Sequence, residues 1–183
     1  MNFIFMSAKA MMVDYNQFKI SKLQPIIDKV LKCGNVKAFD FGKTHCNSIT
    51  TWAILYLLQI FLKSYEEFFS ECLHRGVLDE HGYFSVDKID VDGKPGLFTL
   101  LGIKCIITKY DTIPSEIKAG DLFQIAINDK HHFMLGVGGE DGNIYLFDTH
   151  DRPYGEELVK ALTVKGDKIT WIKKYEKIEE EAA

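Results

Sequence analysis

An almost continuous apolar run of helix length follows Cys46, and it constrains the fold more than any other part of the chain. Between residues 49 and 62 it is interrupted only by Thr50, Thr51 and Gln59. Apolar side chains point in nearly every direction around such a helix, so it must be buried on most sides. The run is too short to span a bilayer, which takes about 20 apolar residues. The sequence therefore predicts a central, buried helix that begins at Cys46 and ends near Lys63.

Length and composition are those of one ordinary soluble domain. The chain has 183 residues, of which 46% are hydrophobic and 26% charged, so a core can form without staples. The net charge of −4 and the lack of a Lys/Arg block give no basis for nucleic-acid binding. The four cysteines form no CxxC pair, and the start has no basic secretory leader. We therefore expect reduced thiols, a cytoplasmic location, and no nucleic-acid or membrane partner.

The expected elements are ordered with helices first and strands afterwards. Apolar spacing predicts a helix over residues 14–31, with Pro25 in its first turn or at its real start. A capping box at residues 64–67 predicts another helix, which runs to about residue 75. Strand-like runs bounded by turn residues follow at residues 105–108, 122–127, 132–137, 144–147 and 169–171. This order is typical of an α+β domain.

The whole chain, residues 1–183, is expected to form a single domain without repeats or linkers. Residues 1–37 would be its N-terminal helical region. Residues 64–100 would be a helix-and-turn insert that shapes a substrate cleft, as loops on a rigid scaffold often do. Residues 173–183, KKYEKIEEEAA, would be a charged tail that frays.

Cys46 is the first candidate for chemistry because it lies where the buried helix begins. The unpaired amides and partial positive charge of a helix N-terminus stabilise a thiolate, lower the thiol pKa and raise its nucleophilicity at neutral pH. Most free cysteines are nevertheless buried and inert. Position alone therefore favours an inert thiol, and a catalytic role also needs a base.

A histidine and an aspartate in the strand-rich half could supply the other groups. His132 begins the second of three expected antiparallel strands, and Asp148 ends the third, so the two are placed to meet across the ladder. Period-two alternation groups His132 with Met134, and its neighbour His131 with Phe133. A carboxylate that accepts from one imidazole nitrogen fixes the tautomer and orientation of the ring. The other nitrogen can then hold an ion pair with a thiolate.

A cysteine at the start of a buried helix, a histidine at a strand start and an aspartate ending the next strand together resemble the papain-like cysteine peptidase superfamily. The pattern is similar to bacteriocin-leader peptidases in CNS at 46–48, HFMLG at 132–136 and IYLFD at 144–148. AGDLFQIA at 119–126 is similar to the Gly-Asp strand before the histidine in NlpC-like and CHAP-type cell-wall amidases. The resemblance covers roughly residues 38–150.

The resemblance implies a papain-like α+β fold, with the Cys-bearing helix packed on an antiparallel sheet. It also implies a bacterial cysteine peptidase or amidase that works through a thioester intermediate. Cys46 would be the nucleophile, His132 the general base and acid, and Asp148 the orienting residue, with His150 or Asp151 as its possible substitutes. The expected partner is a peptide or peptidoglycan-like substrate, and no cofactor or metal is implied.

Asp40 departs from the pattern of the superfamily, which commonly has a Gln at this position whose amide donates to the oxyanion. A carboxylate repels an oxyanion unless it is protonated or turned away. The donor could instead be Asn47 or backbone amides near Cys46, the alignment could be shifted, or turnover could be lost. Losing one oxyanion donor costs about 2.7–4 kcal/mol in studied enzymes. The main alternative is therefore a papain-like binding module without activity.

Two other interpretations remain open. A zinc site would use Cys46, His132 and His150, with His131 as a further ligand, but no HExxH or paired-Cys spacing supports it. A structural or assembly domain would bury Cys46 and expose a large apolar patch. The sequence does not predict an oligomeric state.

Overall fold

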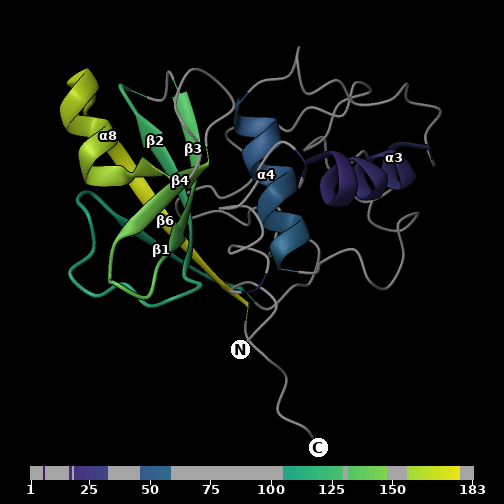
Figure 1. The fold of residues 1–183 in the computed structure, drawn as a ribbon, viewed down its shortest axis with the longest axis horizontal. Helices are drawn as coiled ribbons and strands as arrows, with labels where there is room; N and C mark the ends of the chain where they lie inside the picture. Colours follow the sequence, from purple (N-terminus) through teal and green to yellow (C-terminus); the bar gives the residue numbers. More distant parts are fainter. Residues whose placement is uncertain are drawn as a thin grey trace, which may run out of the picture.

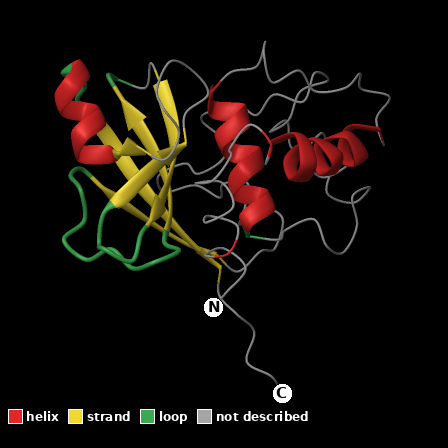
Figure 2. Cartoon of the chain, viewed as in Figure 1, coloured by secondary structure: helices red, strands yellow, loops and turns green. Residues whose placement is uncertain are grey.

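The computed structural model describes residues 6, 17, 19–32, 46–58, 105–129, 132–147 and 156–177. They form an α+β structure in which helices lie on both sides of one sheet (Figures 1 and 2). In chain order the elements are η1 (Lys19–Leu23), α3 (Gln24–Lys32), α4 (Cys46–Leu57), β1 (Cys105–Tyr110), β2 (Leu122–Ile127), β3 (His132–Gly138), β4 (Ile144–Phe147), β5 (Glu156–Glu157), α8 (Leu158–Lys165) and β6 (Ile169–Lys177). The predicted α+β class is confirmed.

The sheet has the strand order β1-β6-β2-β3-β4-β5, and every neighbouring pair is antiparallel. The strands β2, β3 and β4 follow one another along the chain as predicted. The last strand, β6, lies between β1 and β2. In the β2–β3 ladder Phe123 is opposite Gly136, and Ile125 is opposite Met134. This register decides which side of the sheet each residue occupies.

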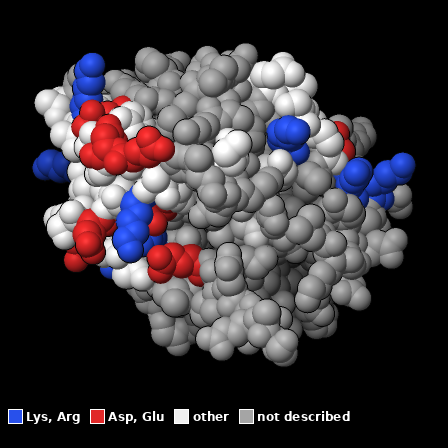
Figure 3. Space-filling view, turned by 60° about the horizontal axis from the view of Figure 1, so that its bottom comes forward, with Lys and Arg blue, Asp and Glu red and all other residues white. Residues whose placement is uncertain are grey.

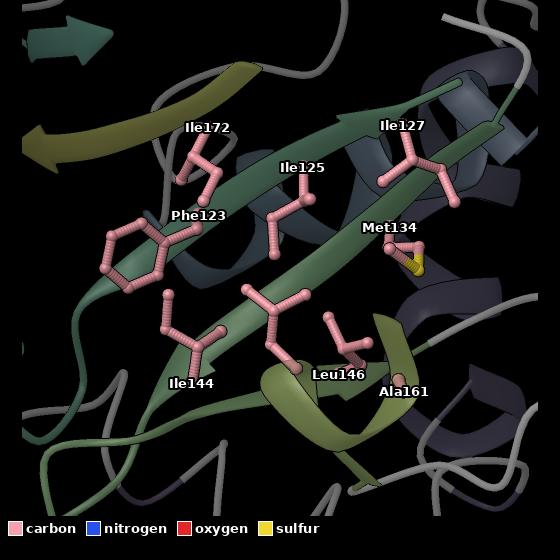
Figure 4. Packing of buried hydrophobic residues seen from close by; sticks show 9 residues of the cluster. Phe123, Ile125, Ile127, Met134, Ile144, Leu146, Ala161 and Ile172 are labelled. Carbon is pink, nitrogen blue, oxygen red and sulfur yellow. The ribbon is translucent and has the colours of Figure 1, made fainter. Parts of the chain in front are cut away.

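One side of the sheet, the α8 side, carries an apolar core made of alternate strand residues (Figure 4). Directly opposed residues of neighbouring strands share a face. The members of this core are Phe123, Ile125, Ile127, Met134, Ile144, Leu146 and Ile172 of the sheet, with Leu158 and Ala161 of α8. All of them are buried, and full burial of each large apolar side chain contributes about 1.5–3 kcal/mol.

The other side of the sheet, the α4 side, is covered over β3 by α4 (Figures 1 and 4). Every residue from Thr50 to Leu58 is buried except Tyr56, which is half-buried, so the predicted central helix is confirmed. The β3 residues on this side are Phe133, Leu135 and Val137, all buried. The predicted helix end near Lys63 lies outside the described residues.

The N-terminal helix is confirmed in part, as the π-helical turn η1 followed directly by α3. Pro25 is the second residue of α3, but it is not in a first helical turn as predicted, because η1 precedes α3 without a break. The change from π-helical to α-helical winding lies next to this proline, whose ring and missing N–H disturb a regular α-helix. Leu23 and Ile27 are buried, whereas Ile20 is exposed. The two side chains of the predicted apolar face that the structure describes, Leu23 and Ile27, are therefore both on the buried side of the segment.

Two short elements, β5 and α8, are absent from the sequence-based expectation. Glu157 precedes α8 without a side-chain cap, and Gly166 ends the helix in the left-handed region, with its N–H donating to the carbonyl of Leu162. Eight residues, two of them β-branched valines, are a weak helical signal. The insert expected over residues 64–100 and its helix lie outside the described residues.

The predicted start of the charged tail, at residue 173, is too early in the sequence. Residues 173–177 form the second half of β6 and do not fray as part of a tail. The cause is alternation: Trp171, Lys173 and Tyr175 lie on one face and are buried, so the strand continues through the lysines. Among the helices that the structure describes, none has the length and apolar character needed to cross a membrane.

Gly138 ends β3 where the chain before β2 passes close to it. Its N–H donates to the carbonyl of Asp121 (2.8 Å), and its carbonyl accepts from Gly120 N–H (2.9 Å). A Cβ atom at this position would collide with the backbone oxygen of Lys118. Glycine is therefore required here by close approach of two backbone segments.

We expect Gly138→Ala to lower the free energy of unfolding by about 1–3 kcal/mol, because a backbone segment would have to move. Gly136→Ala should cost less. Its Cβ would lie 2.8 Å from side-chain methyl groups of Ile125 and Ile144, a milder overlap than the closer approach of a Gly138 Cβ to the Lys118 backbone oxygen. Urea midpoints at constant m-value measure both changes. A larger loss for Gly136→Ala would contradict this account of β3.

Candidate functional site

The two elements predicted to carry the nucleophile and the base lie side by side. α4 starts at Cys46 and β3 starts at His132. The elements pack against each other, and both begin at the same end of the molecule, the upper end in Figure 1. The starts of these two packed elements, which are far apart in the sequence, thus lie toward the same end of the molecule.

Most of the other predicted site residues lie outside the described part of the structure. The backbone of α4 is described from its first residue, but the side chains of its first four residues are not. The residues concerned are Cys46 and Asn47 for their side chains, and Asp40, His131, Asp148, His150 and Asp151 entirely. The described β3–β4 ladder ends at the pair Leu135–Phe147. The predicted approach of Asp148 to His132 therefore lies beyond it.

His132 is half-buried, and the register places it on the α8 side of the sheet. It stands opposite Ile127 in the β2–β3 ladder, and Ile127 belongs to the α8-side core. The neighbouring β3 residue on that side is Met134, while Phe133 and Leu135 lie on the α4 side. The register alone therefore does not turn His132 toward α4, as a pair with Cys46 would need.

A strip of buried polar groups, which the sequence analysis missed, lies on the α4 side of β2 and β6. It consists of Gln124, Trp171, Lys173 and Tyr175, each less than a tenth exposed. The hydroxyl of Tyr175 donates to Oε1 of Gln124 (3.2 Å). The Lys173 ammonium lies 4.4 Å from the centre of the Trp171 ring. We call these four residues the polar strip.

The polar strip is joined to β3 through aromatic packing. The rings of Trp171 and Phe133 have their centres 5.7 Å apart and are tilted by 57°, a geometry that favours edge-to-face contact. Phe133 follows His132 directly in β3. The strip thus supports the start of β3 from the neighbouring strands. The only sign of the polar strip in the sequence is Lys173, at an alternating position of β6. Lysine is rarely fully buried unless it is paired, so this position does not by itself predict burial.

The charged groups described on the surface form small mixed clusters. Lys174 Nζ lies 3.0 Å from Glu176 and 3.5 Å from Asp121. Partial burial lowers the pKa of Lys174, but the hydrogen bond and charge of Glu176 and the charge of Asp121 raise it above its usual value overall. On the face that Figure 3 shows, acidic and basic side chains adjoin one another at the left of the view, whereas the described charged side chains at its right are mostly basic.

The described ranges show no metal site. They contain no group of three His, Cys, Asp or Glu side chains placed to hold a metal ion. The zinc interpretation depends on Cys46, His132 and His150, with His131 as a further ligand. The side chain of Cys46, and His131 and His150 entirely, lie outside these ranges. The zinc interpretation therefore stays a prediction.

The arrangement defines an α+β domain with one antiparallel sheet between α4 and α8. Comparison with known proteins adds no relative: no family model matches the chain, and no curated protein or solved structure is significantly similar to it.

We expect Tyr175→Phe to lower the free energy of unfolding by about 0.5–1.5 kcal/mol, because it removes a buried hydrogen bond to Gln124. Tyr145→Phe is the matched control. Its hydroxyl donates to Asp141 in an exposed hairpin turn, so the change should stay within about 0.5 kcal/mol. Urea denaturation measures the free energy of unfolding of both variants. Equal losses of this free energy would contradict a stabilising role of the buried hydrogen bond in the polar strip.

Proposed function

We propose that the protein is a cysteine-dependent hydrolase of papain-like fold that cleaves a peptide or amide bond. Cys46 is the nucleophile, and a histidine at the start of β3 is the base; the sequence motif assigns that role to His132 and the orienting role to Asp148. The observation that supports the proposal is the packing of α4 against β3 with both elements starting at one end. A bacterial cytoplasmic protein acting on a peptide or on a peptidoglycan-like substrate fits this chemistry.

The reaction would use groups at the starts of α4 and β3. The thiolate of Cys46 attacks the carbonyl carbon, and the histidine that took the thiol proton gives it to the leaving amine. A thioester remains on the sulfur, and water activated by the same histidine hydrolyses it to the acid and restores the thiol. The first amides of a helix lack intrahelical partners. Together with Asn47 they could donate to the oxyanion.

The decisive experiment is alkylation of Cys46 by iodoacetamide as a function of pH. The rates at Cys33, Cys72 and Cys105, separated by peptide mapping, serve as internal references. We expect Cys46 to react with an apparent pKa well below the free value of about 8.5, because an imidazolium and the helix start stabilise the thiolate. Substitution of Cys46 by Ser should abolish hydrolysis of fluorogenic peptide amides. An ordinary pKa at Cys46 would contradict the proposal.

Asp40 provides a second test, because the proposal treats it as a poor substitute for an oxyanion donor. Asp40→Gln should raise the rate of amide hydrolysis by roughly 10²–10³-fold, the usual effect of one oxyanion-hole donor. Asp40→Asn is the control for charge. It removes the negative charge, but its amide reaches less far than that of Gln. If neither variant changes the rate with the same fluorogenic peptide amides, Asp40 does not face the oxyanion.

A papain-like binding module without activity is the second candidate. Two observations favour it: the carboxylate at Asp40, and the register that puts His132 on the α8 side of the sheet. In that case Cys46 titrates like the other thiols, and the Asp40 variants gain no activity.

A further inference from the structure

The turn between β3 and β4 presents an Asp-Gly pair, Asp141-Gly142, at the surface. Both residues are exposed. The backbone of Gly142 is in the left-handed region (φ 81°), and a Cβ atom added there would meet nothing within 4 Å. An aspartate followed by glycine is prone to isomerise, because the glycine amide nitrogen can reach the aspartate side chain without hindrance from a side chain of its own.

The isomerisation proceeds through a cyclic imide. The amide nitrogen of Gly142 attacks Cγ of Asp141, a C–N bond forms, and a Cγ–O bond breaks. The oxygen leaves as water with the amide proton and the carboxyl proton. Water then opens the ring at either carbonyl, which restores aspartate or leaves isoaspartate, whose main chain continues through the side-chain carbon. The reaction therefore needs a protonated carboxyl group that can turn toward the amide nitrogen.

Hydrogen bonds from two residues hold the carboxylate of Asp141. Its Oδ1 accepts from the backbone N–H of Asn143 (3.1 Å), and its Oδ2 accepts from the side-chain amide of Asn143 (3.1 Å) and from the hydroxyl of Tyr145. The hydroxyl of Tyr145 and the backbone amide of Asn143 hold the pKa of Asp141 below its usual value. These donors favour the ionised carboxylate, which cannot lose an oxygen as water.

The attacking nitrogen is also engaged in the folded turn. The N–H of Gly142 donates to the carbonyl of Gly139 (3.2 Å). Gly139 in turn leaves room for the two side chains that meet over it. A Cβ atom added to Gly139 would lie 2.6 Å from Cε2 of Tyr145 and 2.9 Å from Oδ1 of Asp141. The ring of Tyr145 and the carboxylate of Asp141 therefore pack against the same backbone position.

We propose that the hydroxyl of Tyr145 protects Asp141-Gly142 from isomerisation, and that this turn is a site of isoaspartate formation when the hydrogen bond is lost. Isoaspartate adds a carbon atom to the main chain of the turn. The addition falls between the N–H of Gly139 and the carbonyl of Asn143, which are hydrogen-bonded at 2.9 Å. The modification would therefore disturb the closure of the β3–β4 hairpin.

The test compares the rate of isomerisation at Asp141 in the full chain and in Tyr145→Phe at neutral pH. Water enriched in the heavy oxygen isotope labels each product of ring opening, and peptide mapping with fragmentation locates the label. We expect Tyr145→Phe to raise the rate roughly 2- to 10-fold, which corresponds to the net free energy of one hydrogen bond. A synthetic peptide of residues 138–147, which lacks the folded turn, should isomerise faster than the unmodified protein.

Tyr175→Phe is the matched control, because it removes a hydroxyl that donates to Gln124 and leaves the donors to Asp141 in place. If isomerisation passes through global unfolding, Tyr175→Phe raises the rate more than Tyr145→Phe does, and the proposal is overturned. Equal rates in the unmodified protein and Tyr145→Phe, or in the unmodified protein and the peptide, overturn it as well. Asn143→Ala removes the side-chain amide donor and should also raise the rate, which tests the same hydrogen bonds without replacing Tyr145.

Discussion

The packing of α4 against β3 is the contact on which the rest of the structure depends. α4 is apolar around almost its whole circumference, so burial on one face alone would leave apolar surface in water. Even its two threonines, Thr50 and Thr51, are buried. A helix held from all sides cannot shift or rotate without disturbing the core. The buried stretch Thr50–Leu58 is thereby held in place against β3.

The sheet has two chemically different sides, and their identity depends on strand register. The α8 side is apolar throughout its described core, whereas the α4 side includes the polar strip. A slip of one residue in any central strand would exchange the two sets of side chains. Apolar residues would then replace the polar strip, and polar groups would enter the α8-side core. The two unlike cores thus specify a single register better than two similar ones would.

The central strands could be predicted from the sequence because their signals are local. Turn residues bound β2 and β4, and both strands have the predicted limits. The sequence did not predict α8, which is short and lacks a side-chain cap. The predicted end of β6 was too early because lysines are usually exposed to solvent. Alternation also grouped His132 correctly with Met134. Which side α4 would cover could not be predicted, because that depends on the path of the chain between distant elements and on no local pattern.

The position of β6 in the sheet has a consequence for how the protein is made. β6 is the last described strand, yet it lies between β1 and β2 and pairs with both. Until β6 has been synthesised, the edges of β1 and β2 that pair with it are left without a partner strand. Such edges readily pair with other chains. The described sheet can be completed only after β6, which ends at Lys177, has left the ribosome tunnel. From the synthesis of β1 and β2 until that of β6, the nascent chain is therefore open to aggregation and proteolysis, and to chaperone binding.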